Sequence, residues 1–395
     1  MMHEDSAKTP LLLSGAWSCV LGDASGLLRW SRGSWWSPWL LVKLVDSLLR
    51  GMAQVCFANN PWSGALILVG LFLADVYVGL AACACSVVAI ATAKGLGQSD
   101  EAVSAGLASY SAVLVGSVTV ALHPVFVGGP VGVTTWLFML AAAAYSVVVG
   151  VGLHAVLKLV NLPLFTLPFN IVTTLLFLAL TAAGADDTDN SKQFLLDSSL
   201  SLNASGVEPA APAPGITWRQ VVAGSLVAVG QVYAVEHVMC SVLILIALAI
   251  NSSILCLACY GGGLVGTLSA LLVTDASQHS AIAAGVWGYN AVLGAGCAAF
   301  FLEPSWRSLV LGAFSATSCT LLQAALQPVF SALRLPVLTV PFCAWSALLL
   351  LVVSDGPGVR VARVQCLAYP EQHLAWARRR RLLPPAAPPH ANTRL

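Results

Sequence analysis

The chain has 395 residues, of which 58% are hydrophobic and only 9% are charged, and its formal net charge is +1. Soluble globular domains carry about 25% charged residues, so this composition excludes an ordinary soluble enzyme or nucleic-acid-binding domain. Runs of about 20 apolar residues span a bilayer. Stretches without Asp, Glu, Lys or Arg occur at 102–157, 237–274, 276–302, 308–333 and 335–354. The sequence therefore predicts a multi-pass protein embedded in a lipid bilayer.

Changes in composition divide the chain into five parts. The tryptophans near the N-terminus fit a membrane interface, and the charged residues there argue against a cleavable signal peptide. A helix from about Trp36 to Arg50 is expected to lead into the first apolar half. The predicted parts are an N-terminal segment at 1–35, a first transmembrane repeat at 36–183, a polar loop at 184–218, a second transmembrane repeat at 219–354 and a basic tail at 355–395.

The charged segments also predict the orientation in the membrane. The tail contains the arginine run 378–381, and positively charged segments stay on the cytoplasmic side. The connecting loop is acidic and carries the sequon Asn203-Ala204-Ser205, so we expect it to be extracellular and glycosylated at Asn203. If both termini are cytoplasmic, each half crosses the membrane an odd number of times and the halves are inverted. We therefore expect a plasma-membrane protein.

One phrase occurs in both halves, as LPLFTLPF at 162–169 and LPVLTVPF at 335–342. Further matches pair Gln54 with Gln231 and Tyr110 with Tyr289. Their offsets are 177 and 179 residues, close to the 173 of the phrase. Near-constant spacing indicates an internal duplication. We predict an all-α membrane protein with two inverted repeats of about five transmembrane helices each, one tilted re-entrant helix per repeat near 100–118 and 279–297, and a pore between the repeats.

The prolines of the phrase predict unpaired oxygens in an apolar wall. The first proline of each copy suits the first turn of a helix. The second follows five residues later and cannot donate a hydrogen bond, which leaves the carbonyls of Leu164 and Val337 without a helical partner. Thr166 and Thr339 add a hydroxyl at each place. The alternative is that proline only kinks the helix and threonine bonds to its own backbone; the duplication favours an acceptor-rich strip.

Amide and aromatic side chains recur at matched positions as well. Gln54 and Gln231 are intramembrane polar residues, which mark solute pathways, although a packing hydrogen bond is the alternative. Phe57, Tyr110 and Tyr289 supply flat aromatic surfaces, which otherwise serve for packing. The matched phrases contain no charged residue. An oxygen strip between aromatic surfaces suits a small, flat, neutral solute rich in hydrogen-bond donors.

Catalytic chemistry is not expected. The histidines of the apolar body are scattered, and Cys256-x-x-Cys259 has no second ligand pair nearby, so we predict no enzyme activity, no metal and no cofactor. Phosphate-binding loops and a basic face are absent from the sequence, which argues against a nucleic-acid partner.

These motifs resemble the urea transporter family of facilitative channels over about residues 39–370. The residues that carry the resemblance are Asp46-x-x-Leu49-Arg50-Gly51, Gln54-Val55, Asn59-Asn60-Pro61-Trp62-Ser63-Gly64, both Leu-Pro-x-x-Thr-x-Pro-Phe phrases, Gly288-Tyr289-Asn290 and Tyr369-Pro370-Glu371. The resemblance implies passive transport of urea without a cofactor. It also implies a homotrimer, with one pore in each protomer between its two repeats.

The resemblance implies roles for individual residues, with a central site near the two threonines. The implied pore residues are Gln54, Val55 and Phe57 at one end, Gln231 and Val232 at the other, Tyr110, Leu114, Tyr289 and Leu293 in stacking slots, and Thr166 and Thr339 at the centre.

The chain departs from the family pattern at two places. Glu236-His237-Val238-Met239 stands where the family has Asp-Asn-Pro-Trp, and this mouth could respond to pH or face lipid headgroups or a neighbouring protomer. Ser109 and Ser111 replace the glycine and asparagine expected around Tyr110.

Three other functions compete with a passive urea channel. A channel for water or ammonia would differ only in selectivity. A coupled secondary transporter needs an intramembrane carboxylate, for which only Asp75 and Glu236 are candidates. A non-conducting structural membrane protein has no use for duplicated polar phrases.

Overall fold

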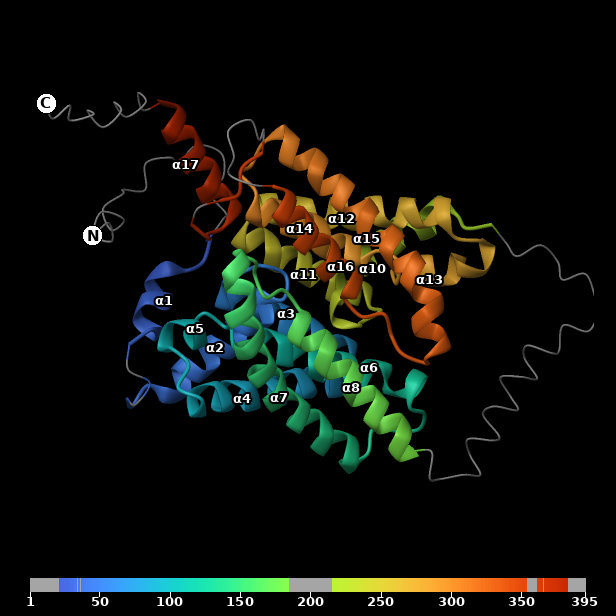
Figure 1. The fold of residues 1–395 in the computed structure, drawn as a ribbon, viewed down its shortest axis with the longest axis horizontal. Helices are drawn as coiled ribbons and strands as arrows, with labels where there is room; N and C mark the ends of the chain where they lie inside the picture. The colour runs from blue at the N-terminus through green and yellow to red at the C-terminus, as the bar shows by residue number, and fades with distance from the viewer. Residues whose placement is uncertain are drawn as a thin grey trace, which may run out of the picture.

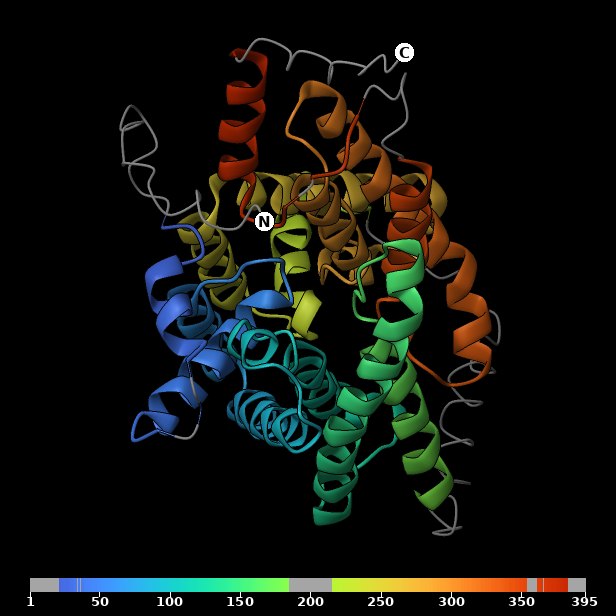
Figure 2. The ribbon, with the colours of Figure 1, turned by 60° about the vertical axis from the view of Figure 1, so that its left-hand side comes forward.

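A computed structural model describes residues 21–33, 35, 37–184, 215–353, 361–364 and 366–382. Over these residues the chain is helical, apart from turns and one isolated bridge between Leu302 and Arg363. Asn203 and most of the connecting loop lie outside the described residues, as does Trp36. Figures 1 and 2 show the first half, blue to green, lying against the second half, yellow to orange.

The two halves have the same order of helices. After a short α1 (Ser25–Ser31), the first half comprises α2 (Leu40–Gln54), α3 (Pro61–Ala74), α4 (Val76–Gly95), α5 (Asp100–Ser104), α6 (Tyr110–Phe126), α7 (Val133–Leu157) with η2 (Lys158–Val160), and α8 (Leu167–Gly184). The second half comprises α10 (Trp218–Gly230) with η3 (Gln231–Tyr233), α11 (Val238–Asn251), α12 (Ser253–Val273), η4 (Ala276–Gln278) with α13 (His279–Ala283), α14 (Tyr289–Phe301), α15 (Trp306–Ala332) and α16 (Val340–Val352). A helix α17 (Pro370–Leu382) follows.

Unusual backbone conformations recur at matched positions. Positive φ angles occur as pairs, at Phe57 (62°) and Ala234 (59°), Gly106 (72°) and Gly285 (77°), Asn161 (52°) and Arg334 (55°), and Phe165 (49°) and Leu338 (53°). Non-glycine residues rarely adopt this conformation. Its recurrence at the same offsets as the sequence matches is therefore independent support for the duplication.

Residues at matched positions also meet one another across the two halves. The Sγ of Cys56 lies 3.7 Å from the hydroxyl of Tyr233, its counterpart 177 positions later. Ser63 donates to the carbonyl of Ala247 at 2.6 Å. The counterparts of Ala247 and Ser63 are Gly70 and Cys240, and these two residues also lie against each other. A Cβ added to Gly70 would be 3.2 Å from the Sγ of Cys240. Such reciprocal contacts are the signature of two units related by a two-fold axis.

The prediction that each Leu-Pro phrase opens a helix at its first proline is wrong. α8 begins at Leu167 and α16 at Val340, so the second proline of each phrase occupies the second helical position. The N–H groups of a first turn have no helical partner, and proline is tolerated there. The helices begin late because Phe165 and Leu338 are left-handed, which a right-handed helix cannot include.

The carbonyls expected to be unpaired, those of Leu164 and Val337, lie in turns. They face the amides of Leu167 and Val340 at 3.4 and 3.5 Å, respectively. The free acceptors of the two phrases are therefore not these carbonyls, and the expectation is corrected on this point.

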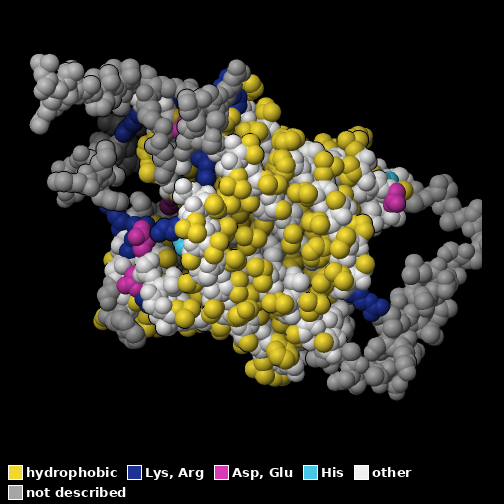
Figure 3. All heavy atoms as spheres, viewed as in Figure 1, with side chains coloured by type: hydrophobic (Ala, Val, Ile, Leu, Met, Phe, Trp, Pro, Cys, Tyr) yellow, Lys and Arg dark blue, Asp and Glu magenta, His cyan; other side chains and the backbone are white. Residues whose placement is uncertain are grey.

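Several helices are suited to a membrane. Among the described residues, α4, α7 with η2, α12 and α15 are long and apolar enough to cross a bilayer, and the pair α10–α11, bent by 78°, gives up to five spans. Shorter apolar helices include α3, α6, α8, α14 and α16. Figure 3 shows a face covered mainly by hydrophobic side chains, with charged side chains towards its edges. This is the surface of a multi-pass membrane protein.

A buried polar cluster joins α2 to the N-terminal segment. Arg50 is fully buried; its Nε donates to Asp46 at 3.1 Å and its Nη1 donates to the carbonyls of Asp23 and Asn59 at 2.9 and 2.6 Å. Burial raises the pKa of the Asp23 carboxyl to about 6, although the neighbouring Arg50 guanidinium acts in the opposite direction.

Replacing Asp23 with asparagine should stabilise the protein at neutral pH. Because the folded-state pKa of about 6 exceeds the ordinary 3.8, folding favours the protonated carboxyl. This favourable contribution is present below pH 4 and is lost as the pH rises through about 6. At about 1.4 kcal/mol per pKa unit, Asp23→Asn should add up to about 3 kcal/mol at pH 7.5 and little at pH 4. Thermal unfolding in detergent at both pH values measures this; an effect independent of pH would contradict it.

Candidate functional site

The two Leu-Pro phrases meet at their threonines. Thr166 Oγ1 and Thr339 Oγ1 lie 2.6 Å apart, and both residues are buried. Asn170 Oδ1 accepts hydrogen bonds from the amide and the hydroxyl of Thr339, both at 3.0 Å. Cys343 is the counterpart of Asn170, and its Sγ lies 3.2 Å from Thr166 Oγ1. These four residues, from α8, α16 and the turns before them, form a central polar cluster within an apolar core.

Two tyrosines fix the turns that present the threonines. Tyr110 is the first residue of α6, and its hydroxyl donates to the carbonyl of Phe165 at 2.5 Å. Tyr289 is the first residue of α14, and its hydroxyl donates to the carbonyl of Leu338 at 2.6 Å. Both carbonyls belong to residues of positive φ directly before the threonines. Each tyrosine therefore stabilises a strained turn and with it the position of one threonine.

Phenylalanine rings lie beside this cluster. The ring of Phe57 stacks on that of Phe300, with centroids 5.7 Å apart, and meets Phe301 and Phe342 edge-on at 6.1 Å. Phe165 contacts Phe342 at 5.4 Å and Phe301 at 6.0 Å. Phe165 and Phe342 belong to the two Leu-Pro phrases, so the rings connect Phe57 to the centre.

The remaining predicted residues are less closely tied to the centre. Leu114 and Leu293 are fully buried one turn after the tyrosines, and Val55 and Val232 are buried at the helix breaks. Gln231 donates to the carbonyl of Ala284 at 2.9 Å, within its own half. The side-chain oxygen of Gln54 is buried without a hydrogen-bond partner among the described residues.

Sequence reasoning missed Asn170, Cys343 and Asn290 as members of the site. Asn170 and Cys343 follow the last phenylalanine of each phrase and stand four residues after the threonines, on the same helical face. Extending the repeated phrase by one position would have found them. Asn290, which the sequence singled out only as part of the Gly288-Tyr289-Asn290 motif, bonds to the carbonyl of Leu338 and the amide of Phe342 on either side of Thr339.

The electrostatics of the centre disfavour cations. α8 and α16 both begin one residue after the threonines, at Leu167 and Val340. A helix N-terminus carries about half a positive elementary charge. Two such termini beside a cluster without charged side chains disfavour a cation at the centre.

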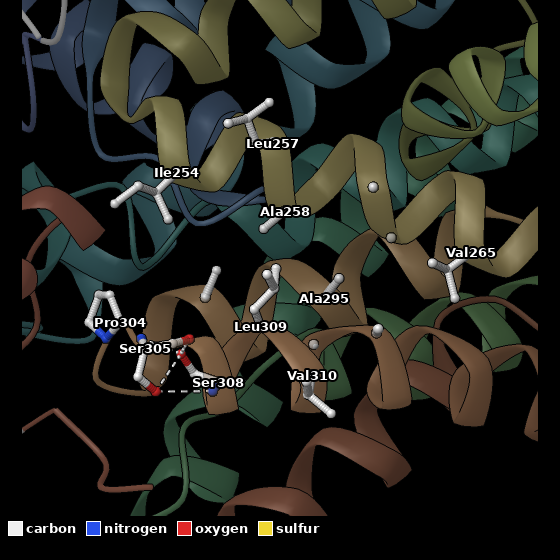
Figure 4. Close-up of a pocket in the computed structure, with 15 residues that line it drawn as sticks. Ile254, Leu257, Ala258, Val265, Ala295, Pro304, Ser305, Ser308, Leu309 and Val310 are labelled. Atoms are coloured by element: carbon white, nitrogen blue, oxygen red, sulfur yellow. Dashed lines mark hydrogen bonds between the residues drawn. The ribbon is translucent and has the colours of Figure 1, made fainter.

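An apolar groove elsewhere has a different character. It has a volume of about 440 Å³ and lies between α12, α14 and α15, as Figure 4 shows. Its only polar side chains are Ser305 and Ser308, which bond to each other's backbone at the start of α15. A groove so poor in hydrogen-bonding groups is unsuited to a donor-rich solute, so the central polar cluster is the candidate site.

Comparisons with known proteins identify the family of the chain. A family model described as Urea transporter matches residues 45–354. The chain is 31% identical over 365 residues to Urea transporter 1 of Ovis aries and of Capra hircus, covering 90% of this chain and 88% of each relative. It is 31% identical over 366 residues to Urea transporter 1 of Rattus norvegicus, with the same coverage. The protein is therefore a multi-pass membrane protein that belongs to the urea transporter family.

Proposed function

We propose that the protein is a passive, channel-like transporter of urea, which moves down its concentration gradient through a path between the two repeats of each protomer. The Thr166–Thr339 pair carries the proposal. Urea is small, planar and neutral, with one carbonyl and two amino groups. A pair of hydroxyls at the centre, between aromatic and apolar side chains, offers hydrogen bonds to such a solute and no counter-charge to a cation.

The other predicted residues would serve the path on either side of this centre. In this proposal Tyr110 with Leu114 and Tyr289 with Leu293 form two related slots for the planar solute. Gln54, Val55 and Phe57 line one end, and Gln231 and Val232 line the other. The ring contacts of Phe57 and the tyrosine hydrogen bonds support this arrangement.

We further propose that residues 36–183 and 219–354 are inverted repeats of about five crossings each. The bent pair α10–α11 counts as one crossing, and α2–α3 is its counterpart. The short helices α5 and α13, each followed by a glycine of positive φ, begin the tilted re-entrant segments. The reciprocal contacts between the halves support the two-fold relation on which inversion depends.

Orientation and assembly complete the proposal. The N-terminal segment and the basic tail are cytoplasmic, the loop at 184–218 is extracellular and glycosylated at Asn203, and the protein forms a homotrimer in the plasma membrane. Glycosidase treatment of wild type and Asn203→Gln tests the loop, because only the wild type should lose mass. Cross-linking in native membranes tests the trimer.

The decisive experiment measures urea permeability of proteoliposomes that contain the purified protein, by light scattering, with and without an opposing proton or sodium gradient. A passive channel gives fast urea uptake that neither gradient changes. Uptake that follows a gradient would indicate a coupled transporter. Well-folded protein that passes water or ammonia but no urea would refute the proposed solute.

A further inference from the structure

The second repeat braces its central turn with two side-chain carboxamides. Asn290 Oδ1 accepts from the amide of Phe342 at 3.2 Å, and its Nδ2 donates to the carbonyl of Leu338 at 3.2 Å. The same Nδ2 donates to Gln323 Oε1 at 2.9 Å, and Gln323 Nε2 donates to the carbonyl of Val286 at 2.9 Å. Both side chains are buried. The start of α16 is therefore held by amide groups from α14 and α15.

The first repeat lacks both carboxamides. The position equivalent to Asn290 is Ser111 on α6, and the position equivalent to Gln323 is Gly150 on α7. The hydroxyl of Ser111 is buried and has no hydrogen-bond partner among the described residues. The backbone groups that correspond to the Asn290 partners, the amide of Phe169 and the carbonyl of Phe165, are still present. An unpaired buried hydroxyl is costly and calls for a ligand or a partner.

The surroundings of Ser111 in the first repeat are closely packed. Ser111 is 6% exposed and its neighbours Tyr110 and Phe165 are 8% and 7% exposed, whereas Asn290 is 0% exposed. The Ser111 hydroxyl itself is buried, as are the side chains of Tyr110 and Phe165 beside it. At Gly150 the three atoms nearest to an added Cβ would belong to the side chains of Leu164 and Pro168, at 3.5–4.0 Å, and not to the backbone.

We propose that the first repeat binds the carboxamide group of urea between Ser111 and Gly150 at the start of α8, in the place that the second repeat fills with the carboxamides of Asn290 and Gln323. The urea oxygen accepts from the amide of Phe169, as Asn290 Oδ1 does from Phe342. A urea amino group donates to the carbonyl of Phe165, which has a second lone pair beside the Tyr110 hydrogen bond. The Ser111 hydroxyl bonds to the same molecule. The inference rests on the proposed transport of urea and adds one asymmetric position to the path.

Two variants test this position in proteoliposomes. Ser111→Asn with Gly150→Gln installs the carboxamides of the second repeat and should lower urea permeability by about tenfold or more, because the position is then occupied by the protein. Its thermal unfolding temperature should be equal or higher, since the brace adds hydrogen bonds. Ser111→Ala should raise the urea concentration at half-maximal flux several-fold, while water permeability stays unchanged.

The controls separate binding from structure. Gly152→Gln adds the same side chain two residues along α7, where nothing lies within 4 Å, and should leave urea flux unchanged. If the double variant gains stability but keeps wild-type flux, Ser111 and Gly150 have only a structural role and the inference is overturned. If the double variant does not fold, Ser111→Ala decides alone, and an unchanged half-maximal concentration overturns the inference. Wild-type protein that conducts no urea would instead refute the proposed function, and this inference with it.

Discussion

Thr166→Val combined with Thr339→Val should lower urea permeability by roughly 10- to 100-fold while the protein remains folded. Valine keeps the shape of threonine but removes the hydroxyl, so the path loses the two hydrogen-bonding groups that lie 2.6 Å apart at its centre. Leaving a desolvated polar group of the solute unpaired costs about 1–3 kcal/mol. Asn170 Oδ1 keeps its bond from the Thr339 amide, which helps to preserve the local structure. Light scattering of proteoliposomes measures the flux.

Two controls accompany this double variant. Thr166→Ser with Thr339→Ser retains both hydroxyls and should keep most of the flux. Thr181→Val removes a hydroxyl further along α8, where it bonds to the carbonyl of Phe177, and should not affect urea. Wild-type flux in the double valine variant would show that the solute does not depend on the two hydroxyls.

Arg50→Met should destabilise the protein by about 3–5 kcal/mol, because removal of one partner leaves a buried charge uncompensated. Arg50 is fully buried and connects three segments, through Asp46 on its own helix, Asp23 before α1 and Asn59 before α3. Methionine fills much of the space but supplies none of the donors. The expected result is a large fall in unfolding temperature, with Asp46 left as an unpaired carboxylate.

Arg32→Met is the matched control for this loss. Arg32 forms an ion pair with Glu101 at 3.0 Å, but the two side chains are 41% and 67% exposed. Exposed pairs contribute about 0–1 kcal/mol, so Arg32→Met should change the unfolding temperature little. Equal effects of the two substitutions would mean that the buried network at Arg50 does not stabilise the fold.

The sequence predicted the general fold and the family because its signals are periodic or repeated. Uncharged runs of membrane length can be recognised from the sequence without knowledge of tertiary contacts. The doubled Leu-Pro phrase identifies equivalent positions in the two halves. The comparisons confirm the family, and the helices confirm the class. The phrase also led to Thr166 and Thr339, whose hydroxyls the fold brings into contact. Their role in transport stays a prediction.

What the sequence did not predict depends on backbone conformation and on contacts between distant residues. The left-handed conformation of Phe165 and Leu338 has no local signal, because neither is a glycine, yet it moves both helix starts past the first proline. The contact of Asn170 with Thr339 joins residues 169 positions apart. Likewise, the meaning of Ser111 depends on its counterpart Asn290, whose bond to Gln323 joins residues 33 positions apart.

The two-fold relation between the halves bears on direction. In the proposed path between inverted repeats, a solute that arrives from either side of the membrane meets matched positions in the same order, since Thr166 pairs with Thr339 and Tyr110 with Tyr289. Such a path has no built-in preference for one direction of transport. Sidedness, whether for an inhibitor or for a substituted urea, can come only from positions where the halves differ, such as Ser111 against Asn290 and Asn60 against His237. A compound that blocks one face alone would therefore identify which of these differences it contacts.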